Sequence, residues 1–140
     1  MVHALERARR HLAPGGFLIC IQPHRTRRPL IAVRAPDRRQ QPICELINPV
    51  FQPLIDSANG AIDSIVARGL VSLIRAENHR FRVRVANPSQ LRSYLSDGIR
   101  PPRFPAGGRK RLLEAWRARP SGAWIEVTEH MTVIGLRAKE

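Results

Sequence analysis

The spacing of apolar residues predicts that helices and strands alternate along this chain. In residues 2–12 the apolar positions recur three and four residues apart, which is typical of an amphipathic helix. Pro14-Gly15-Gly16 predicts the end of that helix, because proline cannot continue it and glycine accepts a left-handed turn. Residues 17–21 are all apolar, which is typical of a strand buried on both faces of a parallel sheet. We interpret this order as half of a β-α-β unit.

The longest helical pattern covers roughly residues 52–76. Gly60 and Gly69 interrupt it, each lowering helix stability by about 1 kcal/mol relative to alanine, so they can bend or split the helix. Asp56 and Asp63 lie on its polar side, whereas a helix bound to a membrane surface would carry basic residues there. We therefore expect this helix to pack in the protein core.

Weaker patterns predict the other elements. They are a strand at 30–33 within the proline-rich segment 22–49, a half-buried strand at 80–85, a helix capped by Ser89 and ended by Gly98, a loop at 99–108, a helix at 109–117, and at 123–137 a hairpin or one strand broken near Glu129-His130. A chain of 140 residues is sufficient for one domain and buries about two-thirds of its unfolded surface. Within it we distinguish residues 1–22, an insertion at 23–108 and a C-terminal part at 109–140.

The charge is strongly positive, with 24 basic against 11 acidic residues and a net charge of +13. Nearly all the basic residues are arginines, which is explained either by biased base composition or by selection for phosphate binding. Such a chain attracts polyanions without sequence preference, in a salt-dependent way. The candidate polyanion contacts are Arg80, Arg82, Arg84, Arg109, Lys110 and Arg111. Aromatic residues, on which nucleic-acid bases stack, make up only 5%.

Cysteine and histidine usage gives little evidence for a metal or disulfide framework. Cys20 and Cys44 are the two cysteines, which favours a reducing compartment, and we expect a cytoplasmic protein. The five histidines show no metal-ligand spacing, so we predict no metal. No stretch of about 18 apolar residues is present, and we predict no membrane span.

The best candidate for a substrate-side site follows the apolar strand. Gln22, His24 and Arg25 come directly after residues 17–21. Open α/β sheets bind ligands beyond the carboxyl ends of their strands. These side chains therefore either face a substrate or belong to a solvated loop.

Residues 5–19 read LERARRHLAPGGFLI. This segment resembles the pattern L-x-E-x-x-R-x-L-x-P-G-G-x-L of class I S-adenosylmethionine-dependent methyltransferases, where it joins a helix to the fifth strand. The resemblance implies an α/β, Rossmann-like three-layer sandwich that is incomplete here and lacks its N-terminal cofactor-binding strands. It also implies a C-terminal antiparallel strand, to which residues 132–137 are similar.

In that family a glycine-rich loop and an acidic residue at the end of the second strand hold the cofactor. No G-x-G-x-G occurs here, so we assign no residue to cofactor binding. We expect that S-adenosylmethionine does not bind this chain alone. Gly15-Gly16 and Gly107-Gly108 are expected to form turns at helix boundaries.

Three functional hypotheses follow. In the first, the chain is a C-terminal portion of a methyltransferase, contributes substrate-side elements and is inactive alone. In the second, it is a small arginine-rich nucleic-acid-binding module. In the third, it is a subunit whose open sheet edge pairs with a second copy or another chain.

Overall fold

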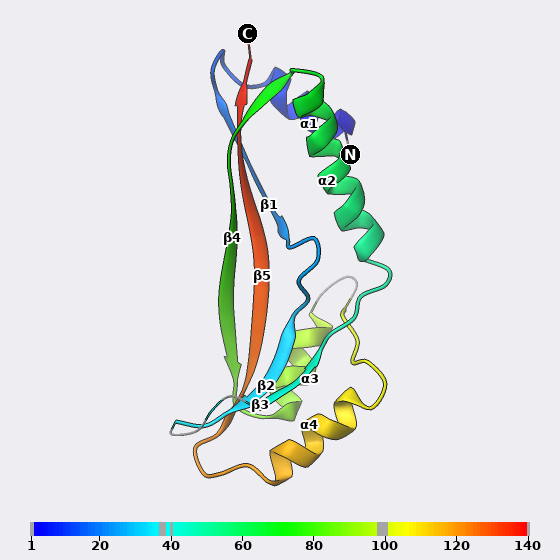
Figure 1. Ribbon diagram of the computed structural model, residues 1–140, viewed down its shortest axis with the longest axis vertical. Coiled ribbons are helices and arrows are strands. Elements are labelled where there is room, and N and C mark those ends of the chain that lie inside the picture. The colour runs from blue at the N-terminus through cyan, green and yellow to red at the C-terminus, as the bar shows by residue number, and fades with distance from the viewer. Residues whose placement is uncertain (1, 37–38, 40, 98–100, 140) are drawn as a thin grey trace. The chain divides into compact units, whose positions relative to one another are not determined.

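The computed structural model describes residues 2–36, 39, 41–97 and 101–139. They belong to an α/β protein whose two compact units each draw on several parts of the chain. Unit 1 comprises Met1–Thr26, Val50–His79 and Met131–Glu140, and unit 2 comprises Arg27–Pro49 and Arg80–His130. Two long strands, β4 (Val71–Val85) and β5 (Trp124–Ala138), contribute residues to both units (Figure 1).

The five strands form one sheet in the order β1-β5-β2-β3, and β4 also pairs with β5. Each of the pairs β1–β5, β2–β3 and β2–β5 runs antiparallel. The parallel arrangement expected from the sequence is therefore wrong for these pairs. The physical reason is that the neighbour of β1 is a strand from the far end of the chain, which arrives in the opposite direction.

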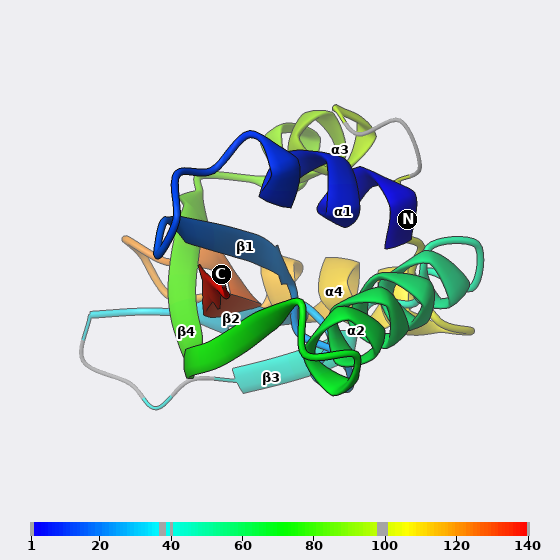
Figure 2. The ribbon, with the colours of Figure 1, turned by 90° about the horizontal axis from the view of Figure 1, so that it is seen from above.

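Unit 1 packs two helices, α1 (Val2–Arg10) and α2 (Gln52–Ala67), against one face of its strands (Figure 2). In β1 (Phe17–Pro23), Leu18 and Cys20 lie opposite Leu136 and Ile134 of β5. These four side chains form the core with apolar residues of both helices. Leu136 is completely buried at the centre of this layer.

The expected turn between α1 and β1 is present. Gly15 has a φ of +72°, a left-handed conformation that side chains disfavour. A Cβ at Gly16 would lie 2.8 Å from the carbonyl oxygen of Ala13, so the chain can reverse this tightly only with glycine there. Pro14-Gly15-Gly16 thus acts through backbone geometry.

The expectation that residues 17–21 are buried on both faces is wrong. Phe17, Ile19 and Ile21 are 57%, 66% and 65% exposed. They alternate with the side chains that face the helices, so one face of β1 is covered and the other is in contact with solvent. β1 is an edge strand, with β5 as its one neighbour within the described part of the chain.

The expected helix over residues 52–76 ends early. α2 stops at Ala67, and Gly69 follows with a φ of +69°. The residues from Val71 onward belong to β4, which also includes the strand expected at 80–85. The helical spacing of apolar residues thus continues across the turn at Gly69 into β4. Periodicity alone could not separate the end of the helix from the start of the strand.

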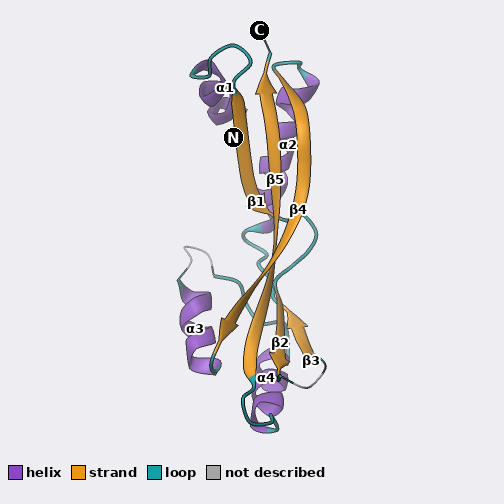
Figure 3. Ribbon diagram, turned by 90° about the vertical axis from the view of Figure 1, so that its left-hand side faces the viewer, coloured by secondary structure: helices purple, strands orange, loops and turns teal. Residues whose placement is uncertain are grey.

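Unit 2 packs α3 (Pro88–Ser96) and α4 (Gly108–Arg117) against a sheet made of β2 (Leu30–Arg34), β3 (Gln41–Glu45) and parts of β4 and β5 (Figure 3). Its core includes Ile31, Ile125 and Val127 from the strands and Leu91 and Leu112 from the helices. β3 was not expected, because prolines break the apolar pattern around it.

Two further expectations in unit 2 are corrected by the structure. Asn87, and not Ser89, caps α3 by accepting a hydrogen bond from the Gln90 N–H at 2.9 Å. Residues 124–138 form one unbroken strand and no hairpin. None of the helices in the described residues has the length and apolar character needed to cross a bilayer.

Candidate functional site

A groove of about 410 Å³ lies between α2 and the carboxyl end of β1 in unit 1. Such a volume lies within the range of small-molecule sites. Its lining is mainly apolar and consists of Leu5, Cys20, Ile21, Gln22, Pro23, Phe51, Leu54, Ile55, Ala58 and Ile62. The groove can therefore accept an apolar group of moderate size.

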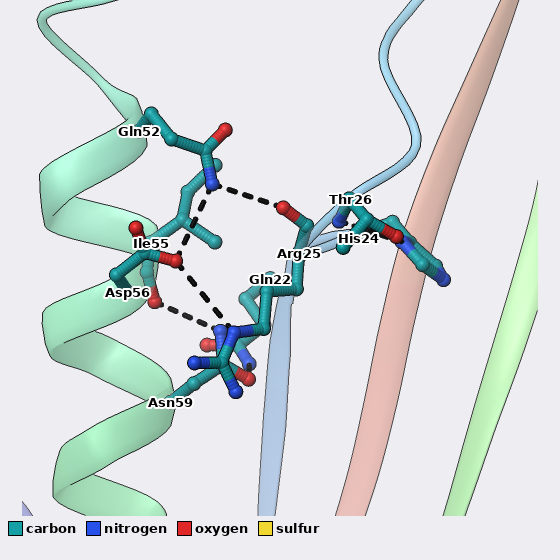
Figure 4. Close-up of polar contacts among 8 residues, drawn as sticks. All are labelled: Gln22, His24, Arg25, Thr26, Gln52, Ile55, Asp56 and Asn59. Carbon is teal, nitrogen blue, oxygen red and sulfur yellow. Dashed lines mark hydrogen bonds and ion pairs between the residues drawn. The ribbon is translucent and has the colours of Figure 1, made fainter.

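Gln22 joins the end of β1 to α2. Its side-chain amide donates a hydrogen bond to Asn59 Oδ1 at 2.8 Å (Figure 4). The Asn59 amide in turn donates to the carbonyl oxygen of Ile55 at 2.8 Å. These two bonds fix both amide orientations at the polar end of the groove.

Arg25 also meets α2. Its Nε lies 3.6 Å from Asp56 Oδ1, and both side chains are about half exposed. Gln52 donates a hydrogen bond to the backbone oxygen of Arg25 at 2.9 Å and another to Asp56 at 3.4 Å. An exposed ion pair of this kind contributes little to stability. Because both side chains are about half exposed, both charges remain accessible to a ligand.

His24 does not share this position. The backbone N–H of Thr26 donates to His24 Nδ1 at 3.1 Å, and Figure 4 shows both residues on the side away from α2. Of the three substrate-side candidates from the sequence, the structure thus places Gln22 in the lining of the groove and Arg25 against α2, and turns His24 away from α2.

The residues described at this groove are suited to binding a ligand. Burial raises the pKa of the Cys20 thiol, which therefore stays protonated near neutral pH and is a poor nucleophile. The carboxylate of Asp56 is paired with Arg25. No cluster of three or more metal-ligating side chains is found among the described residues.

The sequence contained a signal for the helical half of this site. Gln52, Asp56 and Asn59 are four and three residues apart, which places them on one face of α2. Three polar residues at that spacing on an otherwise apolar helix indicate a polar contact. It could be assigned to a partner only when β1 was located beside it.

In unit 2 the six polyanion candidates fall into two groups. Arg80, Arg82 and Arg84 are exposed and alternate along β4. Arg109, Lys110 and Arg111 lie on α4, whose Leu112 packs into the core on the opposite face of the sheet. The structure therefore separates the two arginine-rich segments.

Comparisons with known proteins give no family assignment. No protein-family model, curated protein or solved structure matches the chain.

Proposed function

We propose that this chain supplies the substrate-side elements of an S-adenosylmethionine-dependent methyltransferase, with the groove beside β1 accepting the apolar part of the methyl acceptor. The cofactor-binding half would come from polypeptide outside these residues. We place the protein in the cytoplasm, in keeping with its two free cysteines.

The proposal rests on the bare apolar face of β1. Exposing Phe17, Ile19 and Ile21 in one row is unfavourable, at about 25 cal/mol for each Å² of apolar surface. A strand that is apolar on both sides is typical of a sheet with helices on both faces, and α1 and α2 cover one of them. A second layer of a larger fold would cover the other.

Two further features support the same interpretation. The helix, glycine turn and strand that carry the methyltransferase resemblance form α1, the Gly15 turn and β1. The C-terminal strand pairs antiparallel with β1, placing Arg137 opposite Phe17. The resemblance implies a final antiparallel strand, and this pairing is in keeping with it.

The described residues do not fit a site for S-adenosylmethionine. Asp56 is the one carboxylate among the residues described above as joining β1 to α2, and it is paired with Arg25. β1 is followed by His24 and Arg25, and no glycine-rich loop follows it. No step of methyl transfer is therefore assigned to these residues, which would position the acceptor.

Two experiments test the proposal. In titration calorimetry the chain alone should release no heat with S-adenosylmethionine, and binding with a micromolar Kd would contradict the division of labour. The tagged chain, incubated with extract of its native cells, should capture a protein that crosslinks to S-adenosylmethionine labelled in the methyl group.

The capture should depend on the bare face of β1. Ile19→Lys should abolish the crosslinked product, because a lysine there would be buried without a partner. Val50→Lys is the matched control, since Val50 is 55% exposed but lies outside β1. Equal capture by Ile19→Lys and the unmodified chain, or no crosslinked product with either, would overturn the proposal.

The open edge of β1 favours a second candidate function, a subunit that completes its sheet with a second copy of this chain. Sedimentation velocity over a range of concentrations separates the two. A dimer in the sedimenting chain supports this candidate, and a monomer at all concentrations excludes it.

A further inference from the structure

Unit 2 presents a row of arginines that the proposed function does not use. Arg80, Arg82 and Arg84 are exposed and point to the same side of β4, because alternate residues of a strand share a face. The alternate residues Val83 and Val85 point to the other side of β4 and pack into the core. The row repeats about every 6.7 Å, twice the rise of a strand residue.

The neighbouring strand β5 holds two of these guanidinium groups in place. The Arg84 guanidinium carbon lies 4.2 Å from the centre of the Trp124 ring. Arg82 Nε lies 3.5 Å from Glu126 Oε1. Stacking and ion pairing of this kind orient the planar groups before any ligand arrives.

A fourth arginine joins the same face from β2. Arg34 lies directly opposite Trp124 in the β2–β5 register, and its Nε is 2.9 Å from Glu126 Oε1. Arg34 and Arg82 thus share one buried carboxylate, that of Glu126, and the face carries four arginines in all. The face keeps a positive excess, which attracts anions and is relieved when an anion binds.

We propose that this arginine face, made of Arg34, Arg80, Arg82, Arg84 and Trp124, binds single-stranded nucleic acid. The exposed arginines of β4 contact successive phosphates, and the Arg84 guanidinium, stacked on Trp124, offers its plane to a base. The inference is independent of the proposed function, which concerns unit 1.

Single-stranded nucleic acid fits this face better than other polyanions. Guanidinium groups pair with two phosphate oxygens at once, and their planes stack on unpaired bases. An acidic peptide offers carboxylates but no bases for the Arg84–Trp124 stack. A duplex keeps its bases stacked inside and leaves that stack unused.

Fluorescence anisotropy tests the inference with the whole chain and a labelled single-stranded RNA or DNA of about 20 nucleotides, longer than the roughly 4–16 that one binding fold covers. We expect tighter binding to either single strand than to the duplex of the same sequence. Arg80→Gln/Arg82→Gln/Arg84→Gln should weaken binding about 20-fold. It should also lower the slope of log Kd against log salt by about 2, because each phosphate contact contributes about 0.7.

The matched control removes the same charge from α4 of the same unit, as Arg109→Gln/Lys110→Gln/Arg117→Gln. It should leave affinity within about 3-fold and the salt slope within about 0.5 of the unmodified chain, as expected for charges that contact no phosphate. If the triple β4 variant does not fold, Arg80→Gln alone should lower the slope by about 0.7.

Three results would overturn the inference. One is an equal loss of affinity in the β4 and α4 variants, which would mean that net charge alone drives binding. Another is binding of polyglutamate or of phosphatidylserine vesicles as tight as that of the oligonucleotide. The third is a preference for the duplex.

Discussion

Arg34 and Glu126 form an ion pair at 2.9 Å in which the Glu126 side chain is 7% exposed. Arg82 shares the same carboxylate from β4 at 3.5 Å, so this one group links three strands of unit 2. A buried carboxylate is stable only when its charge is matched, and removing one partner leaves the other uncompensated.

We expect Glu126→Gln to lower the free energy of unfolding by about 2 kcal/mol, less than the 3–5 for a fully buried pair because both arginines remain partly solvated. Urea unfolding measures the loss. Glu114→Gln is the control, since Glu114 lies 4.0 Å from Lys110 on an exposed helix face and should cost less than about 0.5 kcal/mol. Equal costs would show that burial does not strengthen the Glu126 contacts.

Tyr94 is the one tyrosine of the chain, so its ionisation can be followed without assignment. Burial raises its pKa to about 12, and the charge of Glu129 and the hydrogen bond to it add to the shift. Near-ultraviolet absorbance should therefore show a phenolate forming near pH 12. In Glu129→Gln the pKa should fall toward its ordinary value but stay above it, because burial remains. A titration unaffected by this change would contradict the 3.1 Å contact.

Glu129 makes stability depend on pH. Burial raises its pKa, while the hydrogen bond from Tyr94 lowers it by a smaller amount. The folded state therefore keeps this proton to higher pH than the unfolded chain, whose glutamate pKa is about 4.3. Stability from this group is full below that pH and is lost as pH rises through the folded pKa.

Unfolding in urea at acidic and neutral pH checks this sign. Glu129→Gln should match the unmodified chain near pH 4 and exceed it near pH 7. Tyr94→Phe removes the hydrogen bond that favours the carboxylate and should cost about 1 kcal/mol more at neutral than at acidic pH. A Glu129→Gln variant that is less stable than the unmodified chain at neutral pH would contradict the predicted sign.

Local sequence patterns predicted where the helices and strands lie better than they predicted which strands pair with one another. The helix before Pro14, the strand at residues 17–21 and the helix at 109–117 are all present, because each is determined by short-range spacing and turn residues. The direction of pairing was not predictable, since the partner of β1 lies more than a hundred residues away. The apolar residues on both faces of β1 showed that either face can be buried, but they did not show which face the helices cover.

The same limit applies to the candidate site. The position of Gln22 and Arg25 at the end of a strand was visible in the sequence, and both contact α2, Gln22 through Asn59 and Arg25 through Asp56. His24 shares that position but bonds Thr26 instead, which depends on the backbone turn and not on residue type. Asn59 completes the site from a helix whose placement no spacing rule supplied.

Truncating a side chain should cost much more stability on the covered face of the unit 1 strands than on the exposed face. Leu136 is fully buried against the helices, so Leu136→Ala should cost about 2–5 kcal/mol. Ile19 lies on the other face and is 66% exposed, so Ile19→Ala should change the free energy of unfolding by less than about 1 kcal/mol. It should also reduce binding of an apolar fluorescent dye. A large cost for Ile19→Ala would mean that this face is already covered in solution.

Two glycines, one in the middle of α2 and one just after its end, should respond to substitution by alanine with stability changes of opposite sign. Gly60 lies inside the helix, and a Cβ there meets no atom within 4 Å, so Gly60→Ala should stabilise the chain by about 1 kcal/mol. Gly69 has equal space but a φ of +69°, so Gly69→Ala should cost about 1–2 kcal/mol through backbone strain alone. Thermal unfolding of both variants measures the difference. If Gly69→Ala were also stabilising, α2 would continue through residue 69 as periodicity suggested, and β4 would begin later than Val71.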